Sequence, residues 1–273
     1  MELNEATIAA LAEELLAAEA GASPVAPLTE RHPGMGVAEA YAVQRHGRRL
    51  REDRGARPVG RKVGLTSVAM QELLGVGEPD FGYLTDAMLR PDGARLDRDG
   101  LLAPRVEAEI AFRLSAPLRG ADVDRPRALA AIGEIAPALE IVDSRVAEWR
   151  IALADTVADN ASSGLAVLGA FQPLEDSDLA TIGMEMVVTR ADGTQERATG
   201  RGDAVLGHPA EALAWLARAL APFGEGIEAG DVVIPGAMAR AITVERGDVV
   251  RATFTGRLGA VGASFDGHEV EKV

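Results

Sequence analysis

The stretch RVEAEIAFR at residues 105–113 alternates apolar and polar side chains, which is the pattern of a half-buried β-strand. Successive side chains of a strand point to opposite faces, so Val106 and Ile110 face a core. Glu107 and Glu109 then lie side by side on the other face, where two like charges repel each other. Either that face is exposed to solvent, or Glu107 and Glu109 together hold a hard divalent cation such as Mg²⁺ or Mn²⁺.

A third acidic residue lies within an apolar stretch, Ala138-Leu-Glu-Ile-Val142. Burying an isolated carboxylate without a partner is costly. Glu140 therefore either lies on a wet face or joins Glu107 and Glu109 as a third metal ligand. Three carboxylates leave positions open on an octahedral ion, which is what chelation of a substrate requires.

Lysine is rare in this chain, which has only Lys62 and Lys272. Lys62 lies within an apolar strand, Val59-Gly-Arg-Lys-Val-Gly-Leu65, although arginine carries the other positive charges. A lysine can lose its proton when desolvated and an arginine cannot, so Lys62 suits proton transfer. A lysine at a strand end that reaches out to water is the alternative interpretation.

The arrangement of the apolar runs predicts an α+β fold with a core of mixed strands. Strands are expected at residues 59–65, 83–89, 105–114, 138–142, 165–168, 184–190, 232–234, 241–245, 249–255 and 258–265. Asp192-Gly193 predicts a hairpin turn, and Pro209 after His208 predicts the start of a helix. Helices do not regularly separate the strands, so a doubly wound parallel sheet is not expected.

The first 57 residues predict a helical layer, and residues 58–273 predict the β-rich core. Asn4 is expected to cap an amphipathic helix, and a second helix is expected over residues 37–54. Arginines gather at residues 45–54, where acidic residues interrupt them, so a solvated helix face is expected. Ser67 is expected to cap a brief helix through Leu74.

Composition excludes several classes of function. The chain has 42 acidic and 28 basic residues, a net charge of −14, which argues against a nucleic-acid partner. It has no cysteine, so thiol nucleophiles and zinc thiolate sites are excluded. The acidic N-terminus is unlike a secretory signal, and no apolar run is long enough to cross a bilayer, so a cytoplasmic protein without membrane contact is expected.

Other polar residues are expected to have structural roles. Asp143 and Arg145 are expected to pair at a strand end. Four isolated histidines lack the spacing of metal ligands and are expected at the surface or in helix caps: His32, His46, His208 and His268. No Gly-x-Ser-x-Gly or nucleotide-binding glycine motif is present, so a serine hydrolase and a nucleotide-binding protein are not supported.

Five motifs occur in order along the chain. They are Gly60-Arg-Lys-Val-Gly-Leu-Thr-Ser67, Glu78-Pro-Asp-Phe-Gly82, Arg105-Val-Glu-Ala-Glu-Ile-Ala-Phe112, Pro137-Ala-Leu-Glu-Ile-Val-Asp143 and Asp159-Asn-Ala-Ser-Ser-Gly164. Together they resemble the 2-keto-4-pentenoate hydratases of the fumarylacetoacetate hydrolase superfamily. The resemblance runs from about Tyr41 to Phe265.

The resemblance implies a mixed β-roll or barrel-like core and a metal-dependent hydratase. The substrate would be 2-hydroxypenta-2,4-dienoate or a close homologue, from the meta-cleavage of aromatic rings. It implies one divalent ion, Mg²⁺ or Mn²⁺, held by Glu107, Glu109 and Glu140, with Lys62 as the active-site lysine and Asp80 beside the substrate. A substrate-binding loop would contain three further residues: Asn160, Ser162 and Ser163. Ordinary capping and turn hydrogen bonds are the alternative for that loop.

The resemblance also implies a homo-oligomer, with neighbouring pathway enzymes as further partners. Three other functions compete. A 4-oxalocrotonate-type decarboxylase would share the three glutamates and Lys62, although Pro79-Asp-Phe-Gly82 looks like the hydratase form of the loop. An acylpyruvate-type hydrolase would recruit a histidine or an acid dyad, and no histidine lies in a suitable motif. A non-catalytic partner subunit would have no need of Lys62, Asp80 and the glutamates.

Overall fold

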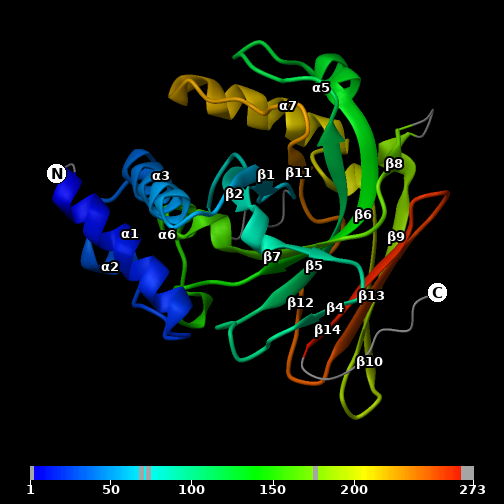
Figure 1. Ribbon diagram of the computed structural model, residues 1–273, viewed down its shortest axis with the longest axis horizontal. Helices are drawn as coiled ribbons and strands as arrows, with labels where there is room; N and C mark the ends of the chain where they lie inside the picture. Colours follow the sequence, from blue (N-terminus) through cyan, green and yellow to red (C-terminus); the bar gives the residue numbers. More distant parts are fainter. Residues whose placement is uncertain (1–2, 68–70, 72–74, 175–177, 266–273) are drawn as a thin grey trace.

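The computed structural model describes residues 3–67, 71, 75–174 and 178–265. Two mixed β-sheets form the core, and helices cover its sides (Figure 1). The helices are α1 (Glu5–Ala20), α2 (Leu28–Arg31), α3 (Val37–Asp53), α5 (Arg125–Ala131), α6 (Leu153–Ala158) and α7 (Pro209–Leu220). The predicted α+β fold with a mixed-sheet core is confirmed.

The larger sheet has nine strands, with β5 near its centre. Its path is β2-β1-β11-β5-β6-β7-β3, with β12 beside β5 and β8 beside β6. Its strands are β1 (Pro58–Gly64), β2 (Asp80–Thr85), β3 (Leu89–Pro91), β5 (Arg105–Leu114), β6 (Ile132–Val142), β7 (Ser163–Leu168), β8 (Gln172–Pro173), β11 (Val232–Ile234) and β12 (Ile242–Thr243). Both long strands of the sheet, β5 and β6, run antiparallel to each other.

The second sheet has five strands in the order β10-β9-β13-β14-β4. Its strands are β4 (Ala94–Leu96), β9 (Gly183–Thr189), β10 (Gln195–Arg201), β13 (Val249–Phe254) and β14 (Gly259–Phe265). β9 and β10 form the hairpin predicted at Asp192-Gly193, where Gly193 takes a φ of 85°. Such a positive φ is easy for glycine and strained for other residues, which is why this dipeptide marks the turn.

The predicted strand at residues 83–89 is wrong in its extent. β2 ends at Thr85, a 3₁₀ turn follows at Asp86–Met88, and β3 then pairs with β7 instead. The Asp86 carboxylate accepts hydrogen bonds from the backbone N–H groups of Arg57 and Ala87, at 3.0 Å each. These bonds turn the chain out of the line of β2, as short acidic side chains do in turns.

The two long helices predicted in the first 57 residues are confirmed. The Asn4 side chain accepts a hydrogen bond from the Thr7 N–H and caps α1, and α3 packs on both α1 and α6 (Figure 1). The short helix expected from Ser67 to Leu74 lies mostly outside the described residues. No helix formed by the described residues is long and apolar enough to cross a membrane.

The expectation of a solvated arginine face on α3 holds at the exposed Arg49 but not at Arg45, Arg48 and Arg51. The Arg48 side chain is only 22% exposed and pairs with Glu225 at 2.7 Å, and Arg51 pairs with Glu19 of α1. Arg45 lies over the Phe223 ring, 4.4 Å from its centroid. Long arginine stems can cover apolar surface while their guanidinium groups find carboxylates or aromatic rings, so this face packs against neighbours.

Candidate metal centre and adjoining site

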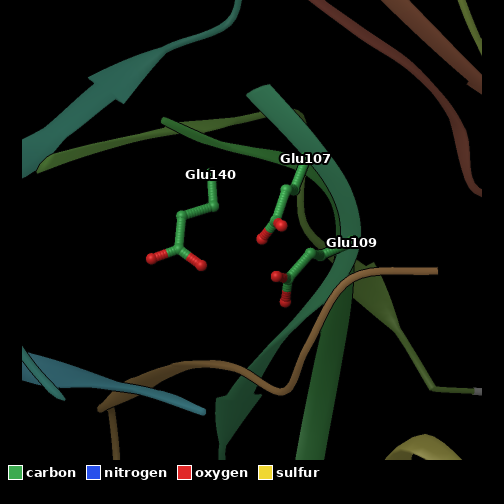
Figure 2. Close-up of side chains that lie close together, drawn as sticks. All are labelled: Glu107, Glu109 and Glu140. Carbon is green, nitrogen blue, oxygen red and sulfur yellow. The ribbon is translucent and has the colours of Figure 1, made fainter. Parts of the chain in front are cut away.

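The three predicted glutamates come together because of the register of β5 and β6. Glu107 lies directly opposite Glu140 in the antiparallel pair, and Glu109 lies two residues along β5 on the same face. One carboxylate oxygen from each residue lies within 4.8 Å of the others. Figure 2 shows the three carboxylates pointing toward one another.

The surroundings of these carboxylates fit a hard cation. Glu109 and Glu140 are buried, and among the described residues Glu109 Oε1 and Glu140 Oε2 receive no hydrogen bond. Buried polar atoms in folded proteins nearly always have a hydrogen-bond partner. These two carboxylate oxygens are therefore expected to bind a group that is not part of the protein, such as a cation. An all-oxygen set of three carboxylates is the donor set that Mg²⁺, Mn²⁺ and Ca²⁺ prefer.

The electrostatics of the cluster point the same way. Burial, together with the charge of Glu140, raises the pKa of Glu107 to about 7. Burial and the neighbouring glutamates also raise the pKa of Glu109 well above its usual range, and burial raises the pKa of Glu140. Buried like charges disfavour ionisation, so the cluster is costly to charge unless a cation compensates it.

Added Mg²⁺ is expected to raise the melting temperature more at pH 8 than at pH 6. The folded pKa of Glu107, about 7, lies above its ordinary value of 4.5. The unfolded chain therefore ionises first, and the metal-free protein loses stability as the pH rises from about 4.5 through 7. Above that range a cation bound by the ionised cluster would restore this stability. Calorimetry with EDTA or Mg²⁺ at both pH values measures the difference, and equal shifts at both would contradict it.

Lys62 lies beside the glutamates on β1, between β11 and β2. Its side chain is buried at 3% exposure, and Nζ lies 3.2 Å from Glu140 Oε1. Nζ also donates to the Ala161 carbonyl at 2.8 Å. The alternative of a lysine reaching water at a strand end is therefore wrong.

In the protein without a bound cation, the surroundings of Lys62 favour its charged form, although desolvation alone would favour the neutral form. Burial alone lowers the pKa of Lys62, but the charges of Glu140, Asp80, Glu107 and Glu109 outweigh it and raise the pKa to about 12. The carboxylates thus hold the side chain as an ammonium. A cation bound to the same carboxylates would weaken this effect by offsetting their charge.

Asp80 also lies close to Lys62, at the start of β2. It pairs with Gly64 of β1 in the sheet and is buried at 2% exposure. A β-carbon placed on Gly64 would lie 2.2 Å from Asp80 Oδ1 and 3.4 Å from Lys62 Nζ, so the missing side chain lets both groups share this space. Asp80 Oδ1 accepts no side-chain hydrogen bond among the described residues, and burial raises the pKa of Asp80.

The predicted loop at residues 160–163 divides into two kinds of residue. The Asn160 side chain binds backbone, accepting from the Tyr83 N–H at 2.8 Å and donating to the Tyr83 carbonyl at 3.0 Å. Ser162 Oγ lies 3.2 Å from Thr156 Oγ1. Ser163 Oγ is buried and has no hydrogen-bond partner among the described residues, so its hydroxyl is free to bind another group.

Arg145 does not form its ion pair with Asp143 as predicted. Its guanidinium pairs with the Asp159 carboxylate, and it meets Asp143 only through that residue's backbone carbonyl, at 2.7 Å. The Asp143 carboxylate instead accepts the N–H groups of Leu102 and Ala103. Asp159 lies far from Arg145 along the chain, so sequence spacing could not reveal this partner.

Two further groups of the site were not predicted. The backbone N–H of Gly236 donates to Glu109 Oε2 at 2.6 Å and orients that carboxylate. A β-carbon on Gly236 would lie 2.1 Å from Thr66 Oγ1, and its φ of 128° also suits glycine. The Ala161 carbonyl beside Lys62 is the second group. Backbone groups leave no signal in side-chain patterns, so only the glycine offered a clue.

Comparisons with known proteins agree on the relatives of this chain. A 2-hydroxyhexa-2,4-dienoate hydratase of Comamonas testosteroni is 46% identical over 239 residues, 86% of this chain and 89% of that protein. A 2-keto-4-pentenoate hydratase of Paraburkholderia xenovorans (strain LB400) is 40% identical over 264 residues, 96% of each chain. No family model matches the chain.

Among solved structures, the fold is similar to a 4-oxalocrotonate decarboxylase from Pseudomonas putida G7, complexed with magnesium and adipate. The TM-score is 0.92 at 38% identity, and the match covers 97% of this chain and 99% of that one. Sequence and structure thus indicate the same group of enzymes over nearly the whole chain. The protein belongs to the 2-keto-4-pentenoate hydratase family.

Proposed function

We propose that this protein is a divalent-metal-dependent hydratase of aromatic meta-cleavage catabolism. It adds water to 2-hydroxypenta-2,4-dienoate, or a close homologue, and forms a 4-hydroxy-2-oxo acid. The observation that carries the proposal is Asp80 Oδ1, a buried carboxylate oxygen beside the Lys62 ammonium that has no side-chain partner among the described residues. Activation of water needs such a base, and the hydratase names of the two sequence relatives support the assignment.

Glu107, Glu109 and Glu140 would hold Mg²⁺ or Mn²⁺ in this proposal. The orphaned buried oxygens and the oxygen-only donor set support it, as does the magnesium of the decarboxylase structure. When bound, the ion supplies Lewis acidity to an oxygen-bearing substrate and offsets the acidic field of the site. An anionic substrate could then approach a protein whose net charge is −14.

Lys62 and Asp80 would divide the proton chemistry. The dienol first loses its hydroxyl proton and gains a proton at C5, which gives the 2-oxo form with a 3,4 double bond. The Lys62 ammonium stabilises negative charge on the 2-oxygen during this step. C4 is then conjugated to the ketone, and Asp80 takes a proton from the water that adds there while C3 is protonated.

The loop at residues 160–163 would contribute to substrate binding mainly through Ser163. Its buried Oγ has no partner within the described parts of the chain, so it can donate to a substrate carboxylate. Ser162, already in contact with Thr156, and Asn160, bound to Tyr83, would support the loop. We further propose a homo-oligomer in the cytoplasm, with residues 1–57 as a helical layer on one catalytic core. Sedimentation velocity of the purified protein would test the oligomer.

Decarboxylation of a 4-oxalocrotonate-type diacid is the second candidate. The structural similarity to a 4-oxalocrotonate decarboxylase favours it, since that enzyme was solved with the diacid adipate. Loss of carbon dioxide needs the metal and Lys62 to stabilise the developing enolate, but it needs no base for water. Asp80 is therefore the residue by which the two functions differ.

Activity on matched substrates distinguishes the candidates. The metal-stripped protein should be inactive, and Mg²⁺ should restore conversion of 2-hydroxypenta-2,4-dienoate to the 4-hydroxy-2-oxo acid, followed by proton NMR. Dienoates with longer tails then define the preferred homologue. Release of carbon dioxide from 4-oxalocrotonate without hydration of the dienoate would instead establish the decarboxylase.

A further inference from the structure

Three consecutive non-glycine residues next to Lys62 have left-handed backbone conformations. The φ angles of Asn160, Ala161 and Ser162 are 55°, 52° and 52°. Left-handed residues other than glycine are unfavourable and normally occur singly. Such strain persists only where surrounding structure over-determines it, and it gathers at functional sites.

Arg145 holds the two ends of this turn. Its guanidinium donates to the carbonyl of Asp159 just before the turn and to the carbonyl of Ser163 just after it, the latter at 2.8 Å. The Asp159 carboxylate in turn accepts two hydrogen bonds from Arg145, one from Nε–H and one from the backbone N–H. Both side chains are buried, so the clamp is shielded from water.

Asn160 holds the turn from the side of β2. Its amide bonds both to the N–H and to the carbonyl of Tyr83. Gly82, the residue before Tyr83, allows the close approach, because a β-carbon there would lie 2.5 Å from the Asn160 carbonyl oxygen. The turn is therefore fixed against both Arg145 and β2.

What the turn presents to the site is the carbonyl of Ala161. That oxygen accepts a hydrogen bond from Lys62 Nζ, which also lies 3.2 Å from Glu140 Oε1 in the glutamate cluster. Without this carbonyl, only the surrounding carboxylates would set the position of the ammonium. The carbonyl of the strained turn therefore sets where Lys62 stands relative to the glutamates.

We infer that Arg145 is a positioning residue, which places the Lys62 ammonium by clamping the left-handed turn at residues 160–162. The inference rests on the proposed function for its effect on turnover, but not for its effect on Lys62. Arg145 touches neither Lys62 nor the glutamates in this arrangement. Its influence passes through the Ala161 carbonyl.

The scarcity of lysine allows a direct test. With ¹⁵N-labelled lysine, the protein contributes only two side-chain ammonium signals, from Lys62 and Lys272, and Lys272→Arg assigns them. Arg145→Gln should shift the Lys62 signal and speed its proton exchange with water. Arg190→Gln is the matched control, because Arg190 bridges Asp248 and Glu196 in the second sheet and should leave the signal unchanged.

Turnover provides the second measurement. Arg145→Gln should lower kcat by about 10- to 100-fold, since displacing a reacting group by about 1 Å can cost ~10²-fold. The affinity for Mn²⁺, measured by electron paramagnetic resonance, should change little. If Arg145→Gln does not fold, Asn160→Ala releases the other hold on the turn without unpairing a buried charge, and the same shift is expected.

An unchanged Lys62 signal in a folded Arg145 or Asn160 variant would overturn the inference, whatever the activity. A shifted Lys62 signal with unaltered kcat would also overturn it, since Lys62 would then not need this placement. If the wild-type protein hydrates no dienoate, the proposed function fails. The lysine spectra still decide whether Arg145 positions Lys62.

Discussion

Glutamine in place of Glu109 is expected to abolish most of the activation by Mg²⁺ while the fold is retained. The substitution keeps the volume of the side chain and its oxygen can still accept the Gly236 N–H, but it removes an anionic ligand from a hard cation. The loss of Mn²⁺ affinity should exceed the roughly 10- to 100-fold that loss of an outer-shell partner costs. Isothermal titration with Mn²⁺ and circular dichroism measure both properties.

The same Glu109→Gln substitution should weaken metal binding but should not lower the stability of the metal-free protein. Burial and neighbouring carboxylates raise the pKa of Glu109, so its ionised form is unfavourable in the metal-free protein. A neutral glutamine removes that cost, and the metal-free variant should melt at or above the wild-type temperature at pH 8. Glu134→Gln is the matched control, because Glu134 lies on β6 at the surface and pairs with Arg113. Unchanged metal affinity in Glu109→Gln would contradict the assignment of the three glutamates.

Asparagine in place of Asp80 is expected to slow hydration by about 10²- to 10⁴-fold, the usual contribution of a general base. Asparagine fits the same buried space and can still hydrogen-bond water, but it cannot accept a proton at neutral pH. Metal affinity should be nearly retained, because Asp80 is not one of the three clustered glutamates. Steady-state kinetics on the dienoate measure the loss.

Asp86→Asn is the control for that substitution. Asp86 follows the end of the same strand and pairs with Arg57 at the surface, so its loss should leave turnover unchanged. Hydration by Asp80→Asn at the wild-type rate would show that another group activates the water.

The sequence could predict whichever parts of the site depend on local geometry. Glu107 and Glu109 are two residues apart in a strand, so they share a face in any fold that keeps the strand. Glu140 was ambiguous, because its place opposite Glu107 depends on the register of two strands that meet through tertiary packing. The family resemblance resolved it, since a shared motif carries information about register that a single strand does not.

The ion-pair partners and charge states in and around the site depend on contacts between segments that are distant in the sequence. Arg145 pairs with Asp159 because α6 brings the chain back beside the end of β6, and no local pattern encodes that return. The charge state of Lys62 depends on four surrounding acidic residues, which outweigh the desolvation considered for the lysine alone. The arginines of α3 likewise met Glu19 and Glu225, whose positions only the folded chain reveals.

The most direct test of the division of labour between Lys62 and Asp80 is proton NMR of the dienoate in deuterated buffer with Mg²⁺. Wild-type protein should form the 4-hydroxy-2-oxo acid with deuterium at C3 and C5. Asp80→Asn should continue to exchange protons at C3 or C5 while it hydrates far more slowly, and Glu109→Gln should lose both processes together. If Asp80→Asn hydrates normally, or loses exchange and hydration in equal measure, the proposed roles of these residues are wrong.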